Sequence, residues 1–447
     1  MVKNDVSEQA LTKARDRIPR IAAFILIFLA GCIVATCGPT KPSAPSVATG
    51  PTATVTVPFD MPVTIAIAGR FGEQVLAVLD TQIARFEAAN PDITVEVIRA
   101  SSSPAQSRQE FITSLETADA RIDVYLLQDT WLTEFATNGW LLALDDYARS
   151  WEIEIDAFLP STVEASTIDG QLWALPWAAD GGMLYYRQDL LDKQGYIPPT
   201  TWADLQAIAL EIQAREKLPH GFVWQGAANE SLTCNTLEFV WASGGEVLDD
   251  TGNVTFDSPE TRSALQQMSD LVTSGTSPPD ITSYSESKAL TAFQNGEAIF
   301  MRNWSFAWAL LNQTDGLLAG QVGLAPLPTS CLFGQSLALS VHSSYSEQAF
   351  RFMAFLTSYE QQLQILRQGG QLPALETVYH DDKVLSEAPS LRDLRAALSV
   401  TRPRPQSPAY LQLSEAIYTE VNTMLHGEQT VATTAATVQE RIEAIIR

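Results

Sequence analysis

The aromatic, carboxylate and amide side chains are the residues of this chain whose types suggest a chemical role. Ten tryptophans occur among 447 residues. Flat aromatic faces pack against the C–H faces of sugar rings, while carboxylates and amides hydrogen-bond to the hydroxyls. Core packing is the ordinary role of a tryptophan, but Trp177 and Trp304 each lie where an expected extended segment ends. These two residues are therefore candidates for ring stacking.

Motifs of catalytic and metal centres are missing from the sequence. The histidines, His220, His342, His380 and His426, do not have the spacing of metal ligands. No Walker phosphate loop, Gly-x-Ser-x-Gly elbow or dinucleotide fingerprint occurs. We expect no catalytic residue, no metal site and no cofactor. A carbohydrate-active enzyme stays open as an alternative, because a pair of catalytic carboxylates leaves no short universal motif.

The formal charge of the chain is −24. Phosphate contacts need clustered Lys and Arg, so this balance argues against nucleic acid and against a polyanionic ligand. A strongly acidic surface is typical of a protein that must stay soluble. We therefore expect a small neutral ligand. We also expect the protein to be a monomer.

Three predicted strands place polar residues at one edge of a sheet. Apolar residues alternate over 63–67 and 93–97, and a buried run covers 124–127, with helical patterns between these segments. Strand–helix repeats favour a parallel α/β sheet, in which ligands bind beyond the carboxyl ends of the strands. The residues there are 69–73, 101–103 and 128–129, although loop residues are commonly polar in any case.

The rest of the folded body extends this pattern. Nearly 390 residues exceed one hydrophobic core, so two lobes are expected. Further strands are predicted over 181–187, 298–301 and 322–325, the last returning the chain to the first lobe. Helices are predicted over 202–216, 258–274, 345–367 and 410–447.

The N-terminus predicts export and a lipid anchor. Basic residues from Lys13 to Arg20 precede a short apolar run that ends Leu29-Ala30-Gly31-Cys32. This is the pattern of a secretory signal over 1–31, and its end resembles the lipobox in which Cys32 is acylated. Cys37 is a poorer candidate, and an uncut signal anchor is the alternative. The Pro-, Ser- and Thr-rich segment 32–60 is expected to be a disordered tether.

Two cysteines, Cys234 and Cys331, remain in the body. Cysteine pairs form disulfides in an oxidising compartment. The sequence alone leaves open whether these two are bonded, because it does not give the distance between their Cα atoms.

Several segments resemble family-1 extracellular solute-binding proteins of carbohydrate ABC importers. They are residues 173–177, 180–190 and 201–205, and residues 222–238 with 300–304 point to the trehalose/maltose-binding branch. The resemblance runs from Val63 to the C-terminus. It implies a two-lobed α/β periplasmic-binding-protein fold (type II), with a ligand cleft between mostly parallel sheets. The first lobe would comprise 61–176 and 323–379, and the second 177–322 and 380–447.

The resemblance also implies the ligand contacts. Asp180 would hydrogen-bond to sugar hydroxyls, and Trp304 would supply a stacking face. The full set of expected ligand-binding residues is Glu73, Ser102, Ser103, Asp129, Trp177, Asp180, Glu230, Trp304, Phe306, Gly334, Gln335 and Gln371.

Three departures from the family pattern bear on the ligand. Gln335 stands where a tryptophan is usual, Gln371 where an arginine is common, and Ala178 where an aromatic residue is frequent. Fewer aromatic platforms and more amides favour a ligand smaller or more polar than two glucose rings. Glucosylglycerol fits that description, with trehalose, sucrose and maltose as alternatives.

We therefore expect a lipid-anchored protein on the periplasmic or extracytoplasmic face of the membrane. It would capture its ligand by cleft closure and deliver it to the transmembrane subunits of an ABC permease. Besides the enzyme, a component that presents the ligand to a signalling receptor is an alternative.

Overall fold

The computed structural model describes residues 62–249, 251–313 and 316–447. The predicted signal segment 1–31, the tether 32–60 and the cysteines Cys32 and Cys37 lie outside the described residues. Within the described ranges, no helix combines the length and the apolar character that crossing a membrane requires.

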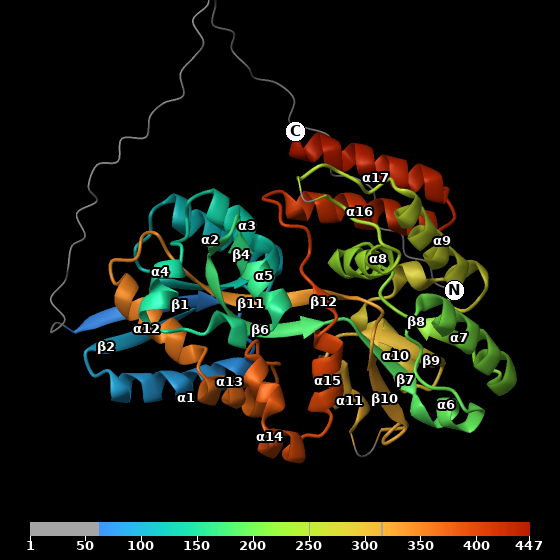
Figure 1. Cartoon of the computed structure of the whole chain (residues 1–447), viewed down its shortest axis with the longest axis horizontal. Helices are drawn as coiled ribbons and strands as arrows, with labels where there is room; N and C mark the ends of the chain where they lie inside the picture. The colour runs from blue at the N-terminus through green and yellow to red at the C-terminus, as the bar shows by residue number, and fades with distance from the viewer. Residues whose placement is uncertain (1–61, 250, 314–315) are drawn as a thin grey trace, which may run out of the picture. The chain divides into compact units, whose positions relative to one another are not determined.

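The first sheet contains the three strands that the alternating pattern predicts. β1 (Val63–Gly69) pairs in parallel with β2 (Ile93–Arg99) along its whole length and with β3 (Val124–Gln128). β11 (Ser330–Leu339) lies antiparallel to β3 and to β6 (Ala174–Gly181), and the short β12 (Thr401–Arg402) pairs with β11. The order is β12-β11-β3-β1-β2, with β6 beside β11 (Figure 1).

Helices cover the first sheet because their apolar stripes face it. α1 (Glu73–Ala89) buries Leu76, Leu79, Ile83 and Phe86, at the spacing of one helix face. The Phe86 ring contacts that of Phe352 on α12 (Ser346–Leu356), with centroids 4.9 Å apart. The other helices that follow strands of this sheet are α2 (Pro104–Glu116) and α3 (Asp129–Thr137).

The second sheet has four strands in the order β10-β7-β9-β8. These are β7 (Met183–Arg187), β8 (His220–Val223), β9 (Ala298–Asn303) and β10 (Val322–Pro326). The expectation that residues 322–325 return the chain to the first lobe is wrong. β10 pairs antiparallel with β7, and the chain enters the first sheet only with β11. Strand pairing of this kind depends on partners distant in the sequence, which the local pattern does not reveal.

Helices of the second half enclose α8 (Glu230–Ala242), which is buried along nearly all of its length. Its neighbours are α9 (Pro259–Thr273) and α16 (Tyr410–Leu425), and α17 (Val431–Ile446) packs beside α16 (Figure 1). The single helix predicted over 410–447 is thus two helices. Gly427, at φ +77°, ends the first, and the Thr430 side chain caps the second.

The remaining elements are short, except for α7. They are α4 (Asp145–Ser150), η1 (Ile155–Ala157), α5 (Pro160–Ser166), β4 (Thr167–Ile168), β5 (Gln171–Leu172), α6 (Gln188–Gln194), α7 (Trp202–Glu216), η2 (Ile281–Ser283), α10 (Glu286–Gln294), α11 (Phe306–Leu311), α13 (Tyr359–Gln364), the π-helix η3 (Ile365–Gly369), η4 (Glu376–His380), α14 (Asp382–Glu387) and α15 (Leu391–Leu398). The helix predicted over 345–367 is therefore also divided.

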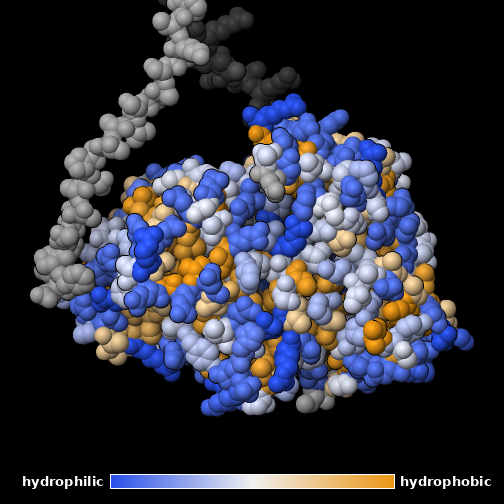
Figure 2. Space-filling model, viewed as in Figure 1, coloured by the Kyte–Doolittle hydropathy of each residue, from blue (hydrophilic) through white to orange (hydrophobic). Residues whose placement is uncertain are grey.

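The face of the molecule drawn in Figure 2 is mostly hydrophilic, with apolar residues gathered in separate small areas. This distribution agrees with the formal charge of −24. The apolar side chains are instead concentrated in the interior, around the two sheets.

Candidate functional site

We call the first sheet with its helices the first half of the structure, and the second sheet with its helices the second half. A cavity of about 500 Å³ is lined by residues from both halves. Its walls combine aromatic rings with a few charged and polar groups, which is the usual make-up of a small-molecule site. The lining residues are Arg70, Pro104, Ala105, Arg108, Gln128, Thr130, Trp131, Asp180, Glu230, Ser231, Cys234, Glu286, Trp304, Phe306, Phe333, Arg404 and Leu411.

A second hollow, of about 860 Å³, runs along residues 244–260 and 402–406. It is larger, but Trp241 is its one aromatic lining residue, and none of the twelve expected ligand contacts lines it. Size alone does not define a site. The convergence of aromatic rings and polar groups favours the smaller cavity.

Four of the expected residues meet at the 500 Å³ cavity. Asp180 comes from the end of β6, Glu230 begins α8, and Trp304 and Phe306 follow the end of β9. Each therefore lies where a strand ends or a helix begins, as a site built at strand ends requires.

The other expected residues do not line this cavity. Glu73 is exposed and forms an ion pair with Arg99, and the Ser103 hydroxyl accepts a hydrogen bond from Gln106 N at the start of α2. Trp177 is only 2% exposed and packs in the core of the first half, because its position on β6 turns the ring inward. Ser102, Asp129, Gly334, Gln335 and Gln371 are likewise outside the lining.

Asp180 is held by backbone groups at the cavity wall. Its Oδ1 accepts hydrogen bonds from Gly181 N at 2.8 Å and from Ser305 N at 3.0 Å. Burial raises the pKa of the carboxyl group to about 6, although these hydrogen bonds act in the opposite direction. The group is therefore mainly ionised at neutral pH and accepts hydrogen bonds.

Arg404 joins two of the expected carboxylates. Its Nη2 lies 2.5 Å from Asp129 Oδ1 and its Nη1 lies 2.8 Å from Glu230 Oε1. Burial raises the pKa of Asp129 although Arg404 lowers it. Burial alone would lower the pKa of Arg404, but the nearby Asp129 leaves it raised overall. Asp129 thus holds Arg404, which itself lines the cavity.

The predicted strand-end segments 69–73 and 128–129 contribute Arg70 and Gln128 to the lining. The sequence did not point to other lining residues, chief among them Arg404, Trp131 and Phe333. Arg404 stands between Pro403 and Pro405 in an acidic chain, which is the one local signal that marks it. Phe333 adds an aromatic surface that the sequence did not lead us to expect at the site. Its ring lies 5.9 Å from that of Trp304, so the tryptophan missing at Gln335 is offset by a neighbouring aromatic residue.

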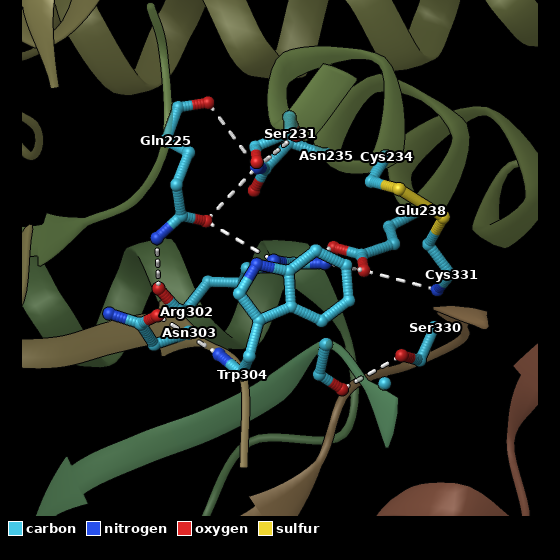
Figure 3. A network of polar contacts seen from close by, with 12 residues as sticks. Gln225, Ser231, Cys234, Asn235, Glu238, Arg302, Asn303, Trp304, Ser330 and Cys331 are labelled. Carbon is cyan, nitrogen blue, oxygen red and sulfur yellow. Dashed lines mark hydrogen bonds and ion pairs between the residues drawn. A yellow bond between two sulfur atoms is a disulfide. The ribbon is translucent and has the colours of Figure 1, made fainter. Parts of the chain in front are cut away.

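A polar network beneath the cavity includes the two body cysteines. Cys234 of α8 and Cys331 of β11 form a disulfide, with their Cα atoms 5.4 Å apart (Figure 3). Glu238 of α8 accepts a hydrogen bond from Cys331 N and forms a fully buried ion pair with Arg302 of β9. The network therefore ties one helix to strands of both sheets.

An aromatic cavity lined from two α/β halves is the kind of site in which a solute-binding protein holds a small molecule. The chain matches the family model "Bacterial extracellular solute-binding protein" over residues 72–363. It is 33% identical over 322 residues to a "Probable ABC transporter-binding protein" of Deinococcus radiodurans, covering 68% of this chain and 75% of that one.

Solved structures agree with this match. Maltose-bound MalE3 of T. maritima is 37% identical, with a TM-score of 0.72, over 85% of this chain and 99% of MalE3. The sugar-binding protein MalE of Xanthomonas citri has a TM-score of 0.75 at 23% identity, over 86% and 97% of the two chains.

The chain therefore belongs to the bacterial extracellular solute-binding protein family. The resemblance stated from the sequence and the α/β periplasmic-binding-protein fold are both confirmed. The family is one of binding proteins and not of enzymes, so the expectation of a non-enzymatic protein is confirmed too.

Proposed function

We propose that this chain is the lipid-anchored binding component of an ABC importer and captures a small neutral sugar or glycoside. The observation that carries the proposal is the joint position of Trp304, Phe333 and Asp180 at one cavity. The rings offer stacking surfaces and the carboxylate accepts hydrogen bonds from hydroxyls. Acylated Cys32 and the tether 32–60 would hold the body near the permease.

The cavity and the relatives support this ligand class. The structure at 37% identity was solved with maltose, and a relative at 25% identity from Pseudomonas aeruginosa is a mannitol-binding protein. A cavity of about 500 Å³ is within the usual range of small-molecule sites. The candidates are glucosylglycerol, trehalose, sucrose and maltose. Gln335, Gln371 and Ala178 lie outside the lining of the cavity, so they do not rank these compounds.

Ligand binding would shift an equilibrium between open and closed arrangements of two lobes, one built on each sheet. The closed, ligand-bound form would be the one that the permease recognises. A ligand shifts such an equilibrium only by as much as it binds one state more tightly. The cavity supplies that difference if residues of both halves contact the ligand together.

Calorimetric titration of the purified chain tests the proposal. The panel is glucosylglycerol, trehalose, sucrose, maltose and mannitol, with citrate as an anionic control. We expect saturable binding of at least one of the neutral compounds, a dissociation constant in the micromolar range or below, and no binding of citrate. Failure of every neutral compound to bind would contradict the proposed ligand class.

A further inference from the structure

The ring of Trp304 rests on a buried cation. The guanidinium carbon of Arg302 lies 4.0 Å from the ring centroid (Figure 3). Arg302 is fully buried, whereas Trp304 lines the cavity. A planar guanidinium over an indole combines cation–π attraction with stacking. Arg302 therefore covers one side of the ring, and only the rest of the ring is left to a ligand.

Arg302 is itself held by several acceptors. Its Nε and Nη2 donate to the two carboxylate oxygens of Glu238, at 3.1 and 2.6 Å, and its Nη1 donates to Gln225 Oε1 at 3.2 Å. A two-point bond between guanidinium and carboxylate fixes the plane of the guanidinium as well as its position. Because Glu238 also accepts from Cys331 N, the disulfide that joins β11 to α8 supports the same carboxylate.

The backbone of Trp304 is fixed at both ends. The Tyr185 hydroxyl donates to Trp304 O at 2.7 Å, and Trp304 N donates to Asn303 Oδ1 at 3.0 Å. With its backbone held in this way, Trp304 can still move by rotation about its side-chain torsions. The Arg302 guanidinium restricts these torsions, since turning the ring would break the stack.

Stability does not by itself account for this ion pair. Replacing a buried pair by apolar residues of similar volume is often neutral or stabilising. The pair at Arg302 lies directly beneath an aromatic wall of the cavity. We propose that Arg302, held by Glu238, is a positioning residue that fixes the Trp304 ring in the orientation that stacks on the ligand. This inference rests on the proposed function, because it assigns a role within the same site.

A pre-oriented ring loses less conformational entropy when the ligand binds. Immobilising one side chain on binding weakens an interaction about 2- to 10-fold. Loss of the guanidinium is therefore expected to weaken ligand affinity by that factor without abolishing binding.

The central variant is Arg302→Lys. Lysine keeps the positive charge but lacks the planar fork that stacks and bonds at two points. Titration with glucosylglycerol, trehalose, sucrose and maltose should give an affinity about 2- to 10-fold below that of the unaltered chain. Arg351→Lys is the matched control, because Arg351 lies 5.7 Å from the ring of Trp151 and does not line the cavity. Its affinity should stay within twofold of the unaltered chain.

A second variant separates positioning from folding. Glu238→Met with Arg302→Met removes both charges and keeps the volume of the pair. We expect this double variant to unfold cooperatively on heating, and to bind its sugar as weakly as Arg302→Lys. The indole N–H resonance of Trp304, assigned with Trp304→Phe, gives a readout that needs no ligand. It should shift or broaden in both Arg302 variants and stay unchanged in Arg351→Lys.

Two results would overturn the inference. One is an unchanged Trp304 resonance in the Arg302 variants, which would show that the ring is held by other groups. The other is a changed resonance with affinity within twofold of the unaltered chain. If the unaltered chain binds none of the four sugars, the proposed ligand set fails, and the resonance alone decides whether Arg302 orients the ring.

Discussion

At the scale of single residues, Asp180 brings a titratable group to the wall of the cavity. Its carboxylate accepts from two backbone N–H groups, and burial raises its pKa to about 6. A hydroxyl of the ligand would donate to the ionised form and stabilise it further. Binding and proton uptake at Asp180 therefore oppose each other.

Ligand affinity is expected to weaken as the pH falls below about 6 and to be constant above pH 7. The decrease approaches about tenfold per pH unit once the carboxyl group is mainly protonated. Titration between pH 5 and 8 measures it. Asp180→Asn should bind weakly with a flat profile, and an equally steep profile in that variant would assign the effect to another group.

In the ligand-free protein, a fall in pH acts on Asp180 in the opposite sense, because it increases the stability of the fold. Its folded pKa lies above its unfolded value, so the folded state takes up the proton first as the pH falls. The contribution of Asp180 to stability therefore increases as the pH drops through 6 and is absent above that range.

Trp304 is expected to carry a large share of the binding energy. Trp304→Ala should weaken affinity about 10- to 100-fold, because it removes an aromatic wall of the cavity. Trp304→Phe keeps an aromatic ring, so it should lose less than half of the binding free energy that Trp304→Ala loses. Trp151→Ala is the control, since Trp151 is 37% exposed and does not line the cavity. Equal affinities of all three variants in calorimetry would exclude stacking on Trp304.

The sequence was enough to predict some of these residues. Trp304 and Asp180 follow recognisable extended segments, and both line the cavity. Arg404 and Phe333 were not predicted, because they reach the cavity through packing of segments distant in sequence. Trp177 shows the converse, since β6 places its side chain in the core although the strand end is close to the site.

At the scale of elements, the turn between β6 and β7 passes close to the buried ion pair. A Cβ atom on Gly182 would lie 2.2 Å from Glu238 Oε1 and 2.5 Å from Arg302 Nη2. Both of these side chains are fully buried, so neither has space to move away. Glycine at this position allows the turn and the ion pair to lie side by side.

Gly182→Ala is therefore expected to destabilise the fold by about 1–3 kcal/mol, the usual cost of overpacking. Denaturant unfolding followed by circular dichroism gives this difference. Gly72→Ala is the matched control, because no atom lies within 4 Å of its added Cβ. Because Gly72 is the N-cap residue of α1, where alanine is less favourable than glycine, this variant should cost less than about 1 kcal/mol. Equal midpoints for both variants would contradict the packing argument.

The elements differ in how much their sequences reveal. β1, β2 and β3 were predicted because alternating or continuous apolar residues and intervening helices mark a parallel sheet. β10 was expected in the wrong half, because an isolated apolar run does not specify its partner. It pairs with β7 through hydrogen bonds that only the folded chain defines.

At the scale of the whole molecule, Arg404 connects the two halves. It bonds to Asp129 at the start of α3 and to Glu230 at the start of α8. The pair of carboxylates shares one buried cation, so removing the cation leaves two like charges without compensation. The arrangement of the halves therefore depends on Arg404.

Arg404→Met is expected to favour a more open arrangement, with a larger radius of gyration in small-angle X-ray scattering and at least tenfold weaker ligand binding. Arg441→Met is the control, because Arg441 pairs with Glu420 between α17 and α16, away from the cavity. An unchanged radius together with unchanged affinity would show that Arg404 does not link the halves energetically.

The central claim is that a sugar binds in the 500 Å³ cavity. A crystal structure of the chain with its tightest-binding sugar tests this claim most directly. We predict electron density for the sugar in that cavity, with a ring against Trp304 and a hydroxyl within hydrogen-bonding distance of Asp180. Density in the hollow along residues 244–260, or in neither place, would contradict the account.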